Sequence, residues 1–139
     1  EVTREAARRS AERAADYDLI LHFGVATRRD MVCFERYAHN WWADLHDIRP
    51  VRLHSEGPTA RECGLPIDDW AAELGYRVSH DAGTYVCNAT LYHALEHMDA
   101  VTFIHIPAVE TAEAFLIGRN IARVVAFYAR QIAETGAMK

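Results

Sequence analysis

Short apolar runs mark the predicted strands of this chain. Residues 19–25 form a nearly continuous apolar segment, which is typical of a strand that is buried on both faces. Residues 76–79 and 101–106 are predicted as strands of the same kind, and residues 34–40 form a weaker candidate. Residues 41–60 contain two prolines, a glycine and mixed charges, which predicts a long loop, and loops of this length often have a functional role.

Apolar residues at helical spacing predict four helices among these runs. Residues 66–74 begin with proline, carry two aspartates in the first turn and stop before Gly75, which are helix start and stop signals. Residues 1–16, 86–98 and 111–135 show helical spacing over longer stretches. Helices that alternate with apolar strands indicate an α/β layered domain rather than a bundle or a sandwich. A length of 139 residues is typical of one domain.

Composition and charge exclude several classes of protein. Hydrophobic residues make up 50% and charged residues 25%, which is ordinary for a globular protein and argues against disorder. The apolar runs are too short for a transmembrane helix, and the net charge of −5 gives no electrostatic footprint for nucleic acid. Three cysteines without a CxxC pair argue against a disulfide scaffold and a cysteine zinc site. We therefore expect a reducing compartment, the cytoplasm.

Cys87 is the strongest single candidate for chemistry. It follows a turn that contains Gly83 and opens the predicted helix over residues 86–98. At a helix N-terminus, the macrodipole and the backbone N–H groups lower the pKa of a thiol and favour the thiolate. The same N–H groups can hold an oxyanion formed when the thiolate attacks a carbonyl. From position alone, however, a small buried hydrophobic residue is the commoner role of a free cysteine.

Two further residues are candidates to act with Cys87. His105 lies near the end of the last predicted strand, where open α/β sheets place their sites, although a hydrogen-bonded core histidine is an alternative. Glu35, on the weaker strand candidate, is interpreted on its own as a surface ion pair with a neighbouring arginine. His93 and His97 are spaced i, i+4 on a predicted helix, but without a third ligand they are interpreted as solvated residues and not as a metal site.

Three segments, taken jointly, give a more specific signal. They read GVA at residues 24–26 followed by VCFERYAHN at residues 32–40, SHDAGTYVCN at residues 79–88, and FIHIP at residues 103–107. In this order and spacing they resemble the glutamate, cysteine and histidine signatures of the pyroglutamyl peptidase I (pyrrolidone-carboxylate peptidase) family, along essentially the whole chain. Members of this family are cysteine peptidases that remove an N-terminal pyroglutamyl residue from peptides.

The resemblance implies that Glu35, Cys87 and His105 form the catalytic set. The Cys87 thiolate would attack the substrate carbonyl, its amide would help bind the oxyanion, and the acyl-enzyme would then be hydrolysed. His105 would accept the thiol proton and later protonate the departing amine, while Glu35 would orient or electrostatically support the site. The substrate-binding residues that the resemblance implies are Val86, Asp47 and Arg49.

The resemblance also implies a fold and a set of partners. The fold is a three-layer α/β/α sandwich with a mixed sheet, of the phosphorylase/hydrolase-like type, in a single domain over residues 1–139. Family members begin with a strand and a Phe/Gly-rich loop, which would lie upstream of Glu1. We therefore expect an N-terminally incomplete domain whose sheet has an exposed edge or a central gap. On its own it should turn over pyroglutamyl amides slowly or not at all, whereas a chain extended at its N-terminus should be active. The expected partners are peptides with an N-terminal pyroglutamate, without nucleic acid, membrane, metal or cofactor, and a homo-oligomer is left open.

Two alternatives stay open at this point. One is a catalytically incompetent fragment of the same descent, which keeps the fold residues but cannot hold substrate without the N-terminal pocket. The other is a non-catalytic α/β interaction module that uses the loop over residues 41–60 as its binding surface.

Overall fold

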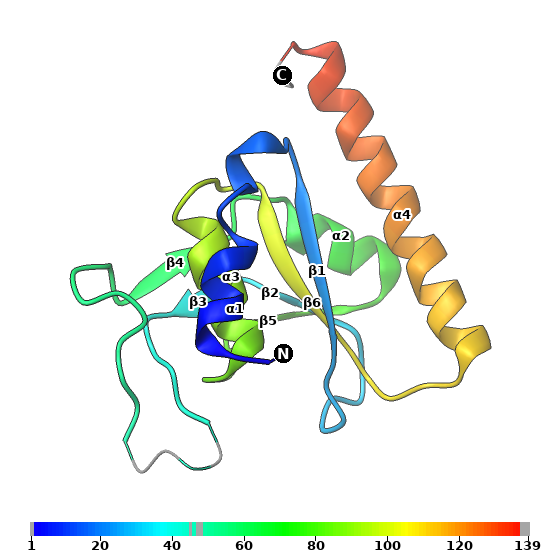
Figure 1. The fold of residues 1–139 in the computed structure, drawn as a ribbon. Helices are drawn as coiled ribbons and strands as arrows, with labels where there is room; N and C mark the ends of the chain where they lie inside the picture. Colours follow the sequence, from blue (N-terminus) through cyan, green and yellow to red (C-terminus); the bar gives the residue numbers. More distant parts are fainter. Residues whose placement is uncertain (1, 45, 47–48, 137–139) are drawn as a thin grey trace.

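A computed structural model describes residues 2–44, 46 and 49–136 of the chain. Its central element is a four-stranded mixed sheet with helices on both faces, so the described residues form three layers (Figure 1). This confirms the predicted α/β/α sandwich. Within the described residues, no helix combines the length and the apolar character needed to span a membrane.

The sheet contains all three of the strands that the apolar runs predict. Its strands pair in parallel at both ends of the sheet, β1 with β6 and β2 with β5, while β6 and β2 pair antiparallel in the middle. The antiparallel register places Cys33 opposite His105 and Glu35 opposite Phe103. The strands in spatial order are β1 (Ile20–Val25), β6 (Val101–Ile106), β2 (Cys33–Glu35) and β5 (Arg77–Ser79).

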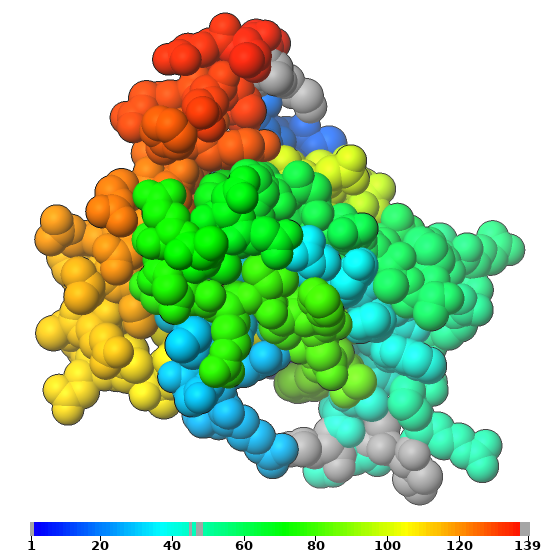
Figure 2. Space-filling model, turned by 180° about the vertical axis from the view of Figure 1, so that it is seen from behind, coloured from blue at the N-terminus to red at the C-terminus, as the bar shows by residue number. Residues whose placement is uncertain are grey.

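Four α-helices cover the sheet in two pairs. One face is covered by α1 and α3, which contact each other, and the other by α2 and α4, which lie side by side when the molecule is seen from behind (Figure 2). Helix α2 ends as predicted, because Gly75 adopts a left-handed conformation (φ 70°) and closes the last turn with a bond to Ala71. The bounds are α1 (Arg4–Ser10), α2 (Ile67–Leu74), α3 (Val86–Leu95) and α4 (Thr111–Glu134).

The predicted helix over residues 1–16 is interrupted. After α1 the chain tightens into turns with i→i+3 bonds and a short 3₁₀ helix, η1 (Ala14–Asp16). The small side chains of Ala7, Ala11 and Ala14 stay buried, so this segment keeps its apolar face toward the molecule while the helical ladder changes. Helix α3 likewise ends at Leu95, three residues earlier than predicted.

The weaker strand candidate over residues 34–40 is two strands in two different sheets. After β2, the chain changes partners at Arg36, whose N–H still bonds to Ser79 while its carbonyl accepts from Cys63. Strand β3 (Tyr37–His39) then pairs antiparallel with β4 (Ala60–Glu62) in a small second sheet. Strand β4 was not predicted, because its sequence Ala-Arg-Glu lacks an apolar alternation.

Strand β1 is less buried than the apolar run predicts. Phe23 is 50% exposed and Val25 69% exposed. The strand lies at one end of the sheet, and no described strand pairs with its outer side. The prediction that this strand is buried on both faces is therefore wrong.

The alternation of side chains along β6 and β2 determines which residues face α3. Ile104 and Phe34 pack in the core between the sheet and the α2–α4 pair, whereas Phe103 packs in the core on the α1–α3 side. Because successive side chains of a strand point to opposite faces, His105 and Glu35 lie on the α3 side of the sheet. The two-residue period therefore directs both candidate side chains toward α3, whose second residue is the candidate nucleophile Cys87.

A fully buried amide joins the first turn of α3 to β3. Asn88 accepts a hydrogen bond from the His39 N–H (2.8 Å) and donates to the carbonyls of His39 (2.8 Å) and Trp41 (3.2 Å). Buried backbone groups without a partner are costly, so this amide fixes the start of α3 relative to β3.

We predict that Asn88→Ala destabilises the fold because it leaves these backbone groups without partners. The expected loss in the free energy of unfolding is at least about 1–3 kcal/mol, the usual cost of one orphaned buried polar group. Urea denaturation measures it. The matched control is Asn120→Ala on α4, which removes only a 3.5 Å contact to the Tyr76 hydroxyl. Equal losses in the two variants would contradict the role of Asn88.

Candidate active site

The side chains of Glu35 and His105 are in direct contact on the α3 side of the sheet. The Glu35 Oε1 atom lies 2.7 Å from the His105 Nδ1 atom. The Glu35 side chain is 0% exposed and that of His105 is 7% exposed. The interpretation of Glu35 as a surface ion pair is therefore wrong, because its carboxylate lies between the strands and α3. The backbone is fixed as well, since the buried Thr102 hydroxyl donates to the Glu35 carbonyl (3.0 Å).

Cys87 completes this group from the opposite side. It is the second residue of α3, it is half-buried, and its thiol lies close enough to His105 to raise the pKa of that ring. The N-cap residue, Tyr85, forms no side-chain cap hydrogen bond at this helix end. The structure thus brings together the three residues that the sequence motifs indicate: a thiol at a helix N-terminus, an imidazole and a buried carboxylate.

Gly24 on β1 leaves the room that this arrangement needs. A methyl group at this position would lie 2.8 Å from the Phe103 ring and 3.4 Å from the Cys87 sulfur. The first distance is too short for two carbon atoms, so any larger residue would displace the ring that packs 4.9 Å from the His105 ring, centre to centre. Gly24 therefore lets the Phe103 ring pack beside His105 without being displaced.

The surroundings of His105 favour its charged form. Burial by itself lowers the pKa of this histidine, but the hydrogen bonds to Cys87 and Glu35, together with their charges, raise it to about 9. As an imidazolium, His105 donates from Nδ1 to Glu35, which leaves Nε2 for Cys87. Because this pKa lies above the usual 6.5, the interaction stabilises the folded chain fully below pH 6.5, and that contribution is lost as the pH rises through about 9.

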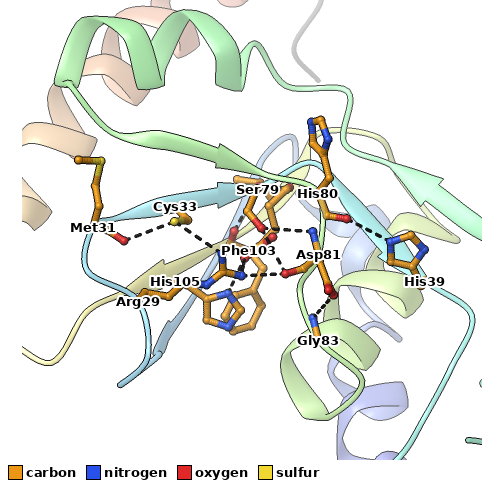
Figure 3. Close-up of polar contacts among 12 residues, drawn as sticks. Arg29, Met31, Cys33, His39, Ser79, His80, Asp81, Gly83, Phe103 and His105 are labelled. Atoms are coloured by element: carbon orange, nitrogen blue, oxygen red, sulfur yellow. Dashed lines mark hydrogen bonds and ion pairs between the residues drawn. The ribbon is translucent and has the colours of Figure 1, made fainter.

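Arg29 is a site residue that the sequence analysis missed. Its Nη2 atom donates to Glu35 Oε1 (2.9 Å) and to the Asp81 carbonyl (2.7 Å). Figure 3 shows the guanidinium reaching from the β1–β2 connection to the segment that follows β5. Nothing in the local sequence Arg28-Arg29-Asp30 distinguishes the half-buried arginine from its exposed neighbour. Only the three-dimensional contact with Glu35 identifies it.

The segment between β5 and α3 is held in a defined turn. The Ser79 hydroxyl contacts both the N–H and the carbonyl of Asp81 (3.2 Å each), and the Asp81 carboxylate accepts from the Gly83 N–H (2.9 Å). Gly83 has a φ of 87°, a conformation that favours glycine. This turn leads directly into the helix that carries Cys87.

Of the three residues implied to bind substrate, the structure places only Val86 next to the candidate catalytic residues. Val86 is the first residue of α3 and is half-buried beside Cys87. Arg49 is exposed, and the structure shows no contact between it and the three central residues. Asp47 lies outside the described residues. A cavity of about 450 Å³ lies next to the start of α3 and is lined by Ala43, Asp44, His46, Thr84 and Tyr85.

The two histidines spaced i, i+4 on α3 and after it, and the two other cysteines, lie in different surroundings from Cys87 and His105. His93 is only 5% exposed, so its interpretation as a solvated helix residue is wrong, whereas His97 is exposed. Cys33 and Cys63 are buried, and burial raises the pKa of both thiols. In the part of the chain that the structure describes, no three His, Cys, Asp or Glu side chains are arranged to hold a metal ion.

Comparisons with known proteins agree with the motifs and the fold. A family model described as pyroglutamyl peptidase matches residues 2–120. The pyrrolidone-carboxylate peptidase of Staphylococcus aureus (strain Newman) is 32% identical over 108 residues, which are 66% of this chain and 51% of that protein. The chain thus spans about half the length of the curated relatives it matches.

Solved structures give the same result. Pyrrolidone carboxyl peptidase from Thermus thermophilus has a TM-score of 0.68 at 25% identity, over 85% of this chain and 68% of that one. The E192I mutant of the Pyrococcus furiosus enzyme has a TM-score of 0.67 at 26% identity, over 84% and 64%. The chain belongs to the pyroglutamyl peptidase family.

We predict that Cys87 reacts with iodoacetamide at neutral pH much faster than Cys33 or Cys63, by roughly tenfold or more. The two buried cysteines are shielded and have raised thiol pKa values, whereas Cys87 lies beside an imidazolium at a helix N-terminus. Peptide mapping by mass spectrometry after short labelling measures the three rates, with the urea-unfolded chain as the reference. Equal labelling of all three in the native state would contradict an activated Cys87.

Proposed function

We propose that this chain carries the catalytic residues of a cysteine peptidase that removes N-terminal pyroglutamyl residues from peptides. The observation that carries the proposal is the 2.7 Å contact between the buried Glu35 carboxylate and the His105 ring, whose pKa is raised by the Cys87 thiol at the start of α3. Family membership supports the substrate class.

The geometry supports a two-step mechanism that begins with acylation. The Cys87 thiolate, stabilised by the adjacent imidazolium, forms a bond to the main-chain carbonyl carbon of the pyroglutamyl residue, at the peptide bond to be broken. The Cys87 N–H at the helix N-terminus holds the resulting oxyanion. His105 then gives its proton to the peptide nitrogen, the C–N bond breaks, and the shortened peptide leaves with a free amine.

Hydrolysis of the acyl-enzyme returns the site to its starting state. The neutral His105 ring accepts a proton from water, whose oxygen attacks the thioester carbon. The C–S bond breaks, pyroglutamate leaves, and the thiolate and the imidazolium are restored. Glu35 keeps the ring oriented throughout, because its Oε1 atom holds Nδ1 and directs Nε2 toward the reacting atoms.

Substrate recognition is proposed at the start of α3. Pyroglutamate is a small neutral lactam, so shape and hydrogen bonds must position it with little help from charge. The cavity beside Thr84 and Tyr85, at about 450 Å³, is large enough for this ring. The family resemblance adds Val86, Asp47 and Arg49 as proposed substrate contacts, and Val86 directly follows Tyr85, which lines this cavity.

The proposal extends to the cellular compartment and the domain organisation of the protein. Three free cysteines fit a reducing compartment, which supports a cytoplasmic protein. We propose that residues 1–139 belong to one domain. A purely structural interaction module is not favoured, because such a module would gain nothing from a fully buried carboxylate that orients a histidine toward a thiol.

We predict that Cys87→Ala abolishes release of a fluorophore from a pyroglutamyl amide, with a loss of at least roughly a thousandfold, because the nucleophile is removed. The matched control is Cys63→Ala, which removes a thiol that packs in the core with Phe34 and Ile104, on the other face of the sheet from the site. The corresponding prolyl amide, which lacks the lactam carbonyl, serves as the control substrate and should be turned over much more slowly. Retained activity in Cys87→Ala would sink the peptidase assignment.

A further inference from the structure

Arg29 bridges the two halves of the candidate active site. We propose that it is a positioning residue for the proposed peptidase reaction: it fastens the buried Glu35 carboxylate to the turn that precedes Cys87 and so holds the His105 ring in line with the thiol. This inference rests on the proposed function, because it assigns a role within the same site. It adds a fourth residue to the three that the motifs indicate.

The first support is how the Glu35 carboxylate is satisfied. Its Oε1 atom accepts from both Arg29 Nη2 (2.9 Å) and His105 Nδ1 (2.7 Å). Its Oε2 atom is buried and has no hydrogen-bond partner among the described residues. Among the described residues, the side chain of this fully buried carboxylate therefore accepts hydrogen bonds only at Oε1, from one guanidinium and one imidazole. A buried charge that loses one of two partners is strongly disfavoured in its original place.

The second support is the other contact of the same nitrogen atom. Arg29 Nη2 also donates to the Asp81 carbonyl (2.7 Å), which belongs to the turn held by Ser79 and Gly83 before α3 (Figure 3). One nitrogen thus joins the strand that carries the carboxylate to the loop that places the nucleophile. Because both contacts share an atom, the distance between Glu35 and this turn is constrained.

The third support is the contrast with ordinary surface arginines. Exposed ion pairs are worth roughly 0–1 kcal/mol and rarely matter for function. The partner of Arg29 is 0% exposed, and the Arg29 side chain itself is 31% exposed. Its neighbour Arg28 is exposed and carries the same charge in the same turn. The chain therefore offers a matched control that changes the charge of this turn without touching the Glu35 carboxylate.

The test compares Arg29→Met, Arg29→Lys and the control Arg28→Met in two measurements. The first is kcat and KM for a fluorogenic pyroglutamyl amide, and the second is the alkylation rate of Cys87 by iodoacetamide. We expect Arg29→Met to lower kcat on the order of 10- to 100-fold with KM little changed, and to slow alkylation of Cys87. Arg29→Lys, which keeps the charge and a donor, should give an intermediate loss, and Arg28→Met should behave as the unchanged chain.

Chemical rescue separates positioning from a merely structural role. Methylguanidine added to Arg29→Ala should restore part of kcat and of the alkylation rate, because a free guanidinium can occupy the space between Glu35 and Asp81. If neither methylguanidine nor the lysine variant restores anything while thermal stability falls, Arg29 only stabilises the fold and the proposal is overturned. If Arg29→Met and Arg28→Met behave alike, it is overturned as well.

The two measurements also keep this inference distinct from the proposed function. If the unchanged chain does not hydrolyse pyroglutamyl amides but Arg29→Met still slows alkylation of Cys87, the substrate assignment fails and the positioning role stands. If hydrolysis occurs and Arg29→Met leaves both rates unchanged, the peptidase stands and the role of Arg29 fails.

Discussion

The structure around the candidate site depends on one constraint, the burial of the Glu35 carboxylate between the sheet and α3. A carboxylate that is 0% exposed must be paired, and here both partners, His105 and Arg29, are positively charged at neutral pH and bind the same oxygen. Each partner comes from a different segment of the fold. The Glu35 carboxylate thus links β2 to β6 and to the β1–β2 turn, and Arg29 extends this link to the loop before α3.

The sheet topology makes this pairing possible. Strands β2 and β6 are antiparallel neighbours, so Cys33 lies opposite His105 and the carboxylate of Glu35, two residues further along, reaches the imidazole from the same face. Strand β1 adds Gly24, whose missing side chain leaves space for the Phe103 ring that packs beside His105. A nucleophile at a helix N-terminus, above the ends of neighbouring strands, is a general location for sites in α/β proteins.

Much of this arrangement could be predicted from the sequence, and the failures have physical causes. The apolar runs identified β1, β5 and β6, and three ordered motifs identified Glu35, Cys87 and His105, because such signals are local or have fixed spacing. At Arg36 the backbone switches from pairing with β5 to pairing with the short strand β4. This switch depends on hydrogen bonds between distant segments, which no local sequence pattern records. The burial of Glu35 and the contacts of Arg29 are long-range features of the same kind. A charged side chain in an ordinary turn looks like solvent-exposed surface until its partner is known.

The most direct test of this account is the titration of the His105 ring, followed by NMR in the unchanged chain and in Glu35→Gln. In the unchanged chain, His105 should stay protonated up to about pH 9. In Glu35→Gln its pKa should fall substantially, because the carboxylate is lost and burial still disfavours the cation. A His105 that titrates at or below 6.5 in the unchanged chain, or whose titration is the same in both proteins, would contradict the claim that Glu35 and Cys87 hold this imidazole as a cation.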